Sequence, residues 1–203
     1  RQNGKHFEGA VVYSLTERHL GGEVFNLPYY VSKARALEEM GADSICIKDM
    51  AGILAPYDAY TLFSELRKAV GVPLHLHTHY TSGMASMTCL KAIEAGVDIL
   101  DTCVAPYAMR TSMPPIEPLL LALEGTGRDP GIGMSRLLDI GRYLESLAPR
   151  YEKHAASGSL SLIDESVIAH QIPGGMTSNL ISQLREMNAL DRLLDVQEEI
   201  QAV

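Results

Sequence analysis

The sequence predicts an α/β protein built around a parallel β-sheet. Four short runs are almost continuously apolar or β-branched, as is typical of strands buried on both faces: residues 9–15, 44–49, 74–79 and 98–104. Segments with apolar residues at helical spacing separate these runs, over residues 27–40, 56–70 and 83–95. Strands that alternate with helices pair in parallel, because each helical crossover returns the chain to the same end of the sheet.

Glycine and proline residues mark where the predicted helices begin and end. Gly41 follows the first helix, at the position where a residue with a left-handed backbone commonly ends a helix. Pro56 suits the first turn of the second helix, because that turn does not use its N–H groups in helical hydrogen bonds. Gly71 and Pro73 separate the second helix from the next strand, and Gly96 ends the third helix.

The alternation of strands and helices stops near Pro130. Beyond it we expect a helix, a polar segment, a Gly-rich loop and a charged amphipathic helix, in that order, over residues 135–147, 150–160, 172–179 and 180–194. Ser135 is a suitable cap for the first of these helices. The sequence therefore predicts an α/β domain over residues 1–130 and a helical extension over residues 131–203.

Composition and charge exclude several classes of protein. Hydrophobic residues make up 46% of the 203 residues and charged residues 21%, so a sizeable core is expected. The net charge of −8 argues against a nucleic-acid-binding surface. No apolar run is long enough for a transmembrane segment, the start does not resemble a signal peptide, and the three cysteines form no disulfide pattern. We therefore expect a cytoplasmic protein, with peripheral contact to a membrane complex left open. Without an initiator Met, we expect the chain to begin within a longer protein.

The third predicted strand carries a cluster of histidines. Because side chains alternate along a strand, His75, His77 and His79 share one face. Two imidazoles two residues apart at the end of a strand can hold one divalent metal ion. The second strand ends in Lys48 and Asp49, which we expect beside the histidines. The alternative is that the histidines fill polar space in a core and that Lys48 pairs with Asp49.

Four segments together point to one family. They are, in chain order, residues 41–52 (GADSICIKDMAG), 77–83 (HTHYTSG), 111–114 (TSMP) and 173–180 (PGGMTSNL). Over nearly its whole length the chain resembles the carboxyltransferase domain of biotin-dependent enzymes. That family includes pyruvate carboxylase, in its single-chain and separate-subunit forms, the oxaloacetate decarboxylase alpha subunit and the pyruvate-side subunit of transcarboxylase. The resemblance implies the C-terminal half of a TIM (β/α)8 barrel over residues 1–130 and a helical funnel over residues 131–203.

The resemblance also implies a set of metal ligands. The family's divalent ion, often zinc, is held by an Asp on the first barrel strand, a carbamylated Lys and two His. Lys48, His77 and His79 match the last three, and manganese or cobalt would be alternatives to zinc. A Lys must lose its proton to take up carbon dioxide, and burial beside a cation favours the neutral amine, so Lys48 would act in catalysis as a carbamate. His75 would lie deeper, as an interior residue.

A proton shuttle is implied in the Gly-rich segment. The family's hydroxyl, usually of Thr, lies just before the Asn of this motif, and here that position is Ser178, with Thr177 as the adjacent alternative. Ser178 would pass a proton between the enol of pyruvate and a nitrogen of biotin, with Gly174 and Gly175 beside the biotin. The structural alternative is an ordinary loop before a helix, with Ser178 or Asn179 as its cap.

Three features depart from the family pattern. The half of the barrel that would carry the Asp ligand and the Arg that holds the pyruvate carboxylate has no counterpart in these residues. Arg110 stands where the family commonly has a small residue. There is no Met-Lys-Met motif for biotin attachment, so biotin would arrive on another domain or chain.

The implied function is metal- and biotin-dependent carboxyl transfer between oxaloacetate or pyruvate and biotin, in either direction. The implied partners are these substrates, a biotin carrier domain, the missing N-terminal half of the barrel and further copies in a homo-oligomer. One alternative is a metal-dependent C–C lyase or synthase related to 3-hydroxy-3-methylglutaryl-CoA (HMG-CoA) lyase, which shares the two histidines but carries no Lys at the position of Lys48. Another is an inactive fragment that needs the missing half-barrel.

Overall fold

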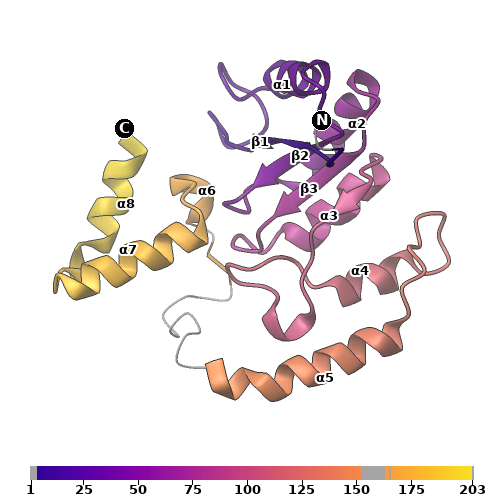
Figure 1. Cartoon of the computed structure of the whole chain (residues 1–203). Helices are drawn as coiled ribbons and strands as arrows, with labels where there is room; N and C mark the ends of the chain where they lie inside the picture. Colours follow the sequence, from indigo (N-terminus) through magenta and orange to yellow (C-terminus); the bar gives the residue numbers. More distant parts are fainter. Residues whose placement is uncertain (1–3, 152–162, 165, 203) are drawn as a thin grey trace.

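The computed structural model describes residues 4–151, 163–164 and 166–202, and their centre is a parallel sheet (Figure 1). Its four strands lie in chain order: β1 (Glu8–Val12), β2 (Ser44–Asp49), β3 (Leu74–Thr78) and β4 (Ile99–Leu100). Every neighbouring pair is parallel, which confirms the predicted fold class. The first and fourth strands are shorter than predicted. Only Ile99 and Leu100 of β4 are paired with β3, and the chain leaves the sheet after Asp101, whose N–H still donates to the Leu76 carbonyl.

Helices pack on one face of this sheet. They are α1 (Leu27–Glu39), α2 (Pro56–Ala69), α3 (Ala85–Glu94) and α4 (Ile116–Leu123). Strand residues such as Ile45, Ile47 and Leu76 are fully buried in one core with helix residues such as Leu62 and Phe63. The Asn26 side chain accepts a hydrogen bond from the N–H of Tyr29 at the start of α1. The predicted helix boundaries are confirmed at two positions: Pro56 begins α2, and Gly41 follows α1 with a φ of +94°.

The opposite face of the sheet is polar and partly open. Alternation places on it Glu8, Ala10 and Val12 of β1, Ser44, Cys46 and Lys48 of β2, and His75 and His77 of β3. We call this surface the polar face. Val12 on it is 45% exposed and Ile99 of β4 is 40% exposed, whereas the residues of β1, β2 and β3 that face the helices are buried. The site described below lies at the end of this face where the strands finish.

Asp49 lies on the helix-covered face, so its predicted place beside the histidines is wrong. Its buried carboxylate accepts hydrogen bonds from the N–H groups of Ile53 and Leu54, at 2.9 and 3.0 Å, and from the Thr78 hydroxyl at 2.8 Å. The reason is the alternation of side chains along a strand, which directs Lys48 and Asp49 to opposite faces. Asp49 thus holds the turn after β2 against the end of β3.

The extension contains more helix than the sequence predicted. After α4 come α5 (Met134–Tyr151), α6 (Val167–His170), α7 (Gly174–Glu186), a 3₁₀ turn (Leu190–Arg192) and α8 (Leu193–Ala202). Figure 1 shows α6, α7 and α8 grouped beside the α/β part. The predicted loop over 172–179 is wrong, because α7 begins at Gly174, and the predicted helix over 180–194 is divided between α7 and α8. Most of the polar segment predicted over 150–160 lies outside the described residues.

Gly174 and Gly175 do not prevent α7 from starting six residues before the predicted helix over 180–194. The first turn of a helix needs few internal hydrogen bonds, and Pro173 supplies a fitting backbone angle just before it. Among the described residues, no helix is both long and apolar enough to cross a membrane.

Candidate metal centre

The two predicted histidine ligands face each other at the end of β3. His77 Nδ1 donates a hydrogen bond to Asp101 Oδ2 at 2.7 Å, and His79 Nδ1 donates one to the Thr111 carbonyl at 2.7 Å. Because a carboxylate and a carbonyl only accept, both protons lie on Nδ1. The two remaining ring nitrogens, Nε2 of His77 and Nε2 of His79, are 3.1 Å apart. Two lone pairs this close require a cation between them, either a proton or a metal ion.

The separation of these nitrogens matches a shared metal ion. Zinc lies about 2.0–2.1 Å from a histidine nitrogen. With ligand angles between octahedral and tetrahedral values, two such nitrogens are about 2.8–3.4 Å apart. The observed 3.1 Å lies in this range, and both side chains are half-buried at the open end of the polar face. The residues present therefore fit a divalent ion.

Lys48 lies on the neighbouring strand at the same level. It is the cross-strand partner of His77 in the parallel register of β2 and β3, so both side chains leave the sheet on the polar face. Lys48 is half-buried. The sheet therefore brings Lys48 and His77 to one surface. The His79 ring contacts the His77 ring there, Nε2 to Nε2.

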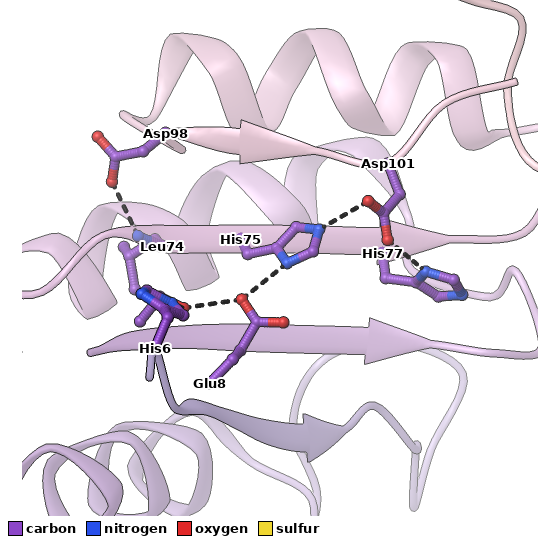
Figure 2. Close-up of polar contacts among 8 residues, drawn as sticks. His6, Glu8, Leu74, His75, His77, Asp98 and Asp101 are labelled. Atoms are coloured by element: carbon purple, nitrogen blue, oxygen red, sulfur yellow. Dashed lines mark hydrogen bonds and ion pairs between the residues drawn. The ribbon is translucent and has the colours of Figure 1, made fainter. Parts of the chain in front are cut away.

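His75 lies deeper and between two carboxylates. Its Nδ1 forms a hydrogen bond with Glu8 Oε2 at 3.0 Å (Figure 2). Its Nε2 lies 3.0 Å from Asp101 Oδ1, close enough for an ion pair, but the geometry of this second contact does not suit a hydrogen bond. Only 9% of its surface is exposed. The hydrogen bond to Cys46 raises the pKa of His75 to about 10, and the hydrogen bond to Glu8 adds to this against the opposing effect of burial. This agrees with the prediction of an interior residue.

The two carboxylates beside His75 remain ionised. Burial alone would raise the pKa of Asp101, but the hydrogen bond from His77 and the charge of His75 outweigh it, so this pKa is lowered. For Glu8, burial again raises the pKa, and the hydrogen bonds with Ser44 and His75 reverse the shift. Negative charge is therefore concentrated along the polar face, where it favours a bound cation.

A second group of metal-type side chains occurs deeper on the polar face. Ligand atoms of Glu8, Cys46 and His75 lie within 4.8 Å of one another. Both ring nitrogens of His75 already lie beside carboxylates, so ion pairing accounts for this group. It differs from the predicted ligand set of Lys48, His77 and His79.

Ser178 begins the second turn of α7, and Gly174 in the first turn packs against Thr111, whose carbonyl accepts a hydrogen bond from His79. Ser178 Oγ donates to the Gly174 carbonyl at 2.9 Å, and Thr177 is buried. A Cβ added at Gly174 would lie 2.3 Å from Thr111 Cγ2, whereas one added at Gly175 would meet nothing within 4 Å. Thr111 therefore contacts both α7 and the histidine pair: its side chain packs against Gly174, and its carbonyl accepts a hydrogen bond from His79.

Gly174→Ala should accordingly displace α7 and the Ser178 hydroxyl. A displacement of about 1 Å at a reacting group can cost roughly 10²-fold in rate. We expect a loss of turnover of that order with metal affinity almost unchanged, measured in the assembled enzyme. Gly141→Ala is the matched control, because Gly141 also lies within a helix, α5, and its added Cβ would lie 3.8 Å from Val104 Cγ1, an ordinary van der Waals distance. Equal activity of the two variants would show that the contact with Thr111 does not position α7.

The sequence interpretation missed Asp101 and Thr111. Asp101 had a usable signal, because it lies on the fourth predicted strand, next to the histidine strand, and carboxylates commonly support metal-binding histidines. Thr111 acts on His79 through its main chain, which its residue type does not reveal. Arg110, also on this loop, is exposed and has a φ of +54°.

Comparisons with known proteins point to one family. Residues 25–144 match the family model described as HMGL-like, and residues 167–203 match one described as a conserved carboxylase domain. The chain is 44% identical to a pyruvate carboxylase subunit of Methanocaldococcus jannaschii, over 98% of this chain and 34% of that protein. It is 36% identical to the methylmalonyl-CoA carboxyltransferase 5S subunit of Propionibacterium freudenreichii, over 100% of this chain and 39% of that protein.

Solved structures show the same likeness. The carboxyl transferase domain of Rhizobium etli pyruvate carboxylase with pyruvate matches 98% of this chain with a TM-score of 0.88 and 36% identity, and 34% of that chain is covered. The complete multifunctional enzyme from the same organism gives a TM-score of 0.90 at 35% identity, over 98% of this chain and 18% of that one. The chain thus spans 34% of the length of the first two curated relatives.

Proposed function

The chain belongs to the HMGL-like family, and we propose that it contributes to metal- and biotin-dependent carboxyl transfer between oxaloacetate or pyruvate and biotin. The observation that carries this proposal is the pair of Nε2 atoms of His77 and His79, 3.1 Å apart with both Nδ1 protons engaged elsewhere. The names of the similar proteins, a pyruvate carboxylase subunit and a carboxyltransferase subunit, support the chemical class.

Lys48, as a carbamate, would be the third metal ligand from these 203 residues, together with His77 and His79. Zinc is the ion we propose, and manganese or cobalt would also suit nitrogen and oxygen ligands. When bound, the ion would supply positive charge that polarises the keto group of the substrate. Lys48 would react with carbon dioxide as the free amine, and the carbamate formed would be an anionic oxygen ligand.

Ser178 would move the proton. A hydroxyl can donate and accept at once, so Ser178 could exchange its bond to the Gly174 carbonyl for one to substrate and pass a proton to or from a biotin nitrogen. The space next to Gly175 is open and would accommodate the biotin ring, whereas the Thr111 side chain fills the space next to Gly174. The biotin would be carried by another domain or chain.

Residues 1–130 would supply the second half of a TIM barrel, and residues 131–203 its funnel. The open polar face, with Val12 and Ile99 exposed, supports a covering half that brings the Asp ligand and the Arg for the substrate carboxylate. A barrel of this type needs eight strands, and the described residues contain four in one sheet.

This division gives a direct experiment. We expect the 203 residues expressed alone to bind zinc weakly, to associate through their open strand edges and to show no metal-dependent decarboxylation of oxaloacetate with free biotin. Co-expression with the first half of a related barrel should restore the reaction. A soluble monomer of this chain with turnover equal to the completed enzyme would falsify the half-barrel proposal.

A lyase or synthase of the HMG-CoA lyase type remains the second candidate. Two features support carboxyl transfer over it. One is Lys48, which provides the carbamate position, and the other is the match of residues 167–203 to the conserved carboxylase domain.

A further inference from the structure

We propose that Asp101 is a positioning residue that fixes the proton position and the direction of the His77 ring. The inference rests on the proposed function in one respect, namely that Nε2 of His77 is the atom that would hold the metal. It goes beyond that function by giving a role to a residue that contacts neither substrate nor biotin in the proposal.

The contact between Asp101 and His77 is short and well defined. His77 Nδ1 donates to Asp101 Oδ2 at 2.7 Å, shorter than the usual N–H···O distance of about 2.9–3.0 Å. Bonds to a charged acceptor are characteristically this short. An acceptor at Nδ1 holds the proton there, so Nε2 keeps its lone pair and points toward His79. The carboxylate therefore selects the only neutral form of His77 that can bind a metal through Nε2.

Asp101 is itself held firmly. Its N–H donates to the Leu76 carbonyl at 3.1 Å, which keeps this residue beside β3 although the β4 ladder has ended. Its second oxygen faces His75, whose other nitrogen lies 3.0 Å from Glu8. The Ser44 hydroxyl in turn donates to Glu8 at 2.8 Å.

These contacts form one chain across the polar face, from Ser44 through Glu8, His75 and Asp101 to His77. Figure 2 shows its part from Glu8 to His77. Its members come from β2, β1, β3 and the residue after β4, so the whole sheet sets the position of the last ring. The chain also gives a role to the buried His75 and to the exposed Glu8, neither of which belongs to the proposed metal ligands. They keep the Asp101 carboxylate from turning away from His77.

The test uses the assembled enzyme and two readouts. The first is the dissociation constant for zinc, and the second is the tautomer of His77 in metal-free protein, read from ¹⁵N chemical shifts of labelled histidine. For Asp101→Ala we expect the zinc dissociation constant to rise roughly 10–100-fold, as for other residues that support a metal ligand, and the proton of His77 to spread over both nitrogens. Asp101→Asn keeps the shape but offers one acceptor for two histidines, so it should weaken binding in the same direction.

Asp98→Asn is the matched control. It removes the same charge from the same edge of the sheet, but Asp98 accepts from the Leu74 N–H and pairs with Arg67, away from His77 (Figure 2). Unchanged zinc affinity and an unchanged His77 tautomer in both Asp101 variants would overturn the inference. If His77→Ala itself leaves zinc affinity unchanged, the proposed metal centre fails, and the tautomer of His77 in metal-free protein still decides the role of Asp101.

Discussion

Ser178→Ala is expected to lower turnover by roughly 10²–10⁴-fold while zinc affinity stays the same. General acid–base groups contribute rate enhancements of this size. Ser178 begins the second turn of α7, its hydroxyl donates to the Gly174 carbonyl, and it is not one of the proposed metal ligands. Oxaloacetate decarboxylation by the assembled enzyme and a zinc titration measure the two quantities. Ser178→Thr should keep much of the activity, because it keeps the hydroxyl.

Thr177→Val separates Ser178 from its neighbour. Thr177 is buried and its hydroxyl donates to the Pro173 carbonyl, so the substitution keeps the shape and removes the alternative proton carrier. Turnover should remain near normal in this variant. Near-normal turnover in Ser178→Ala instead would move the role to Thr177 or to a water molecule.

His77→Ala and His79→Ala should each weaken zinc binding by more than the roughly 10–100-fold expected for a supporting residue. Each removes one of the two facing Nε2 atoms, so the remaining nitrogen has no partner ligand on β3. Equilibrium dialysis with zinc measures the loss. Turnover should fall in parallel, because loss of the metal ion removes the positive charge that would polarise the keto group of the substrate.

His19→Ala is the matched control for these variants. His19 is an exposed histidine whose partner is Asp58, so its removal should leave zinc affinity unchanged. A zinc dissociation constant that stays constant in His77→Ala and His79→Ala would place the ion elsewhere in the molecule.

The parallel sheet was predictable because its short strands, each with apolar side chains on the face that the helices cover, alternate with helices along the chain. Residues 44–49 are an example, since Ile45 and Ile47 face the helices and Cys46 adds a third apolar side chain. The same run shows what was overlooked. Alternation alone separates Lys48 from Asp49, and applying it would have placed Asp49 with the helices.

The extension was predicted less well because local composition misled the interpretation of α7. Two glycines suggested a loop, but a helix tolerates glycine in its first turn, and Gly174 is required there by the approach of Thr111. That contact joins two segments far apart in the sequence, and neither segment predicts it. The pairing of Asp101 with His77 is similar, because it depends on the register of β4 against β3.

X-ray absorption at the zinc edge of the assembled enzyme tests the central claim most directly. Our account predicts that the atoms bonded to zinc are nitrogen and oxygen only, at about 2.0–2.1 Å, with the scattering pattern of two imidazoles from His77 and His79. A sulfur atom at about 2.3 Å would contradict it, because it would mean that the ion is held by the group of Glu8, Cys46 and His75 instead.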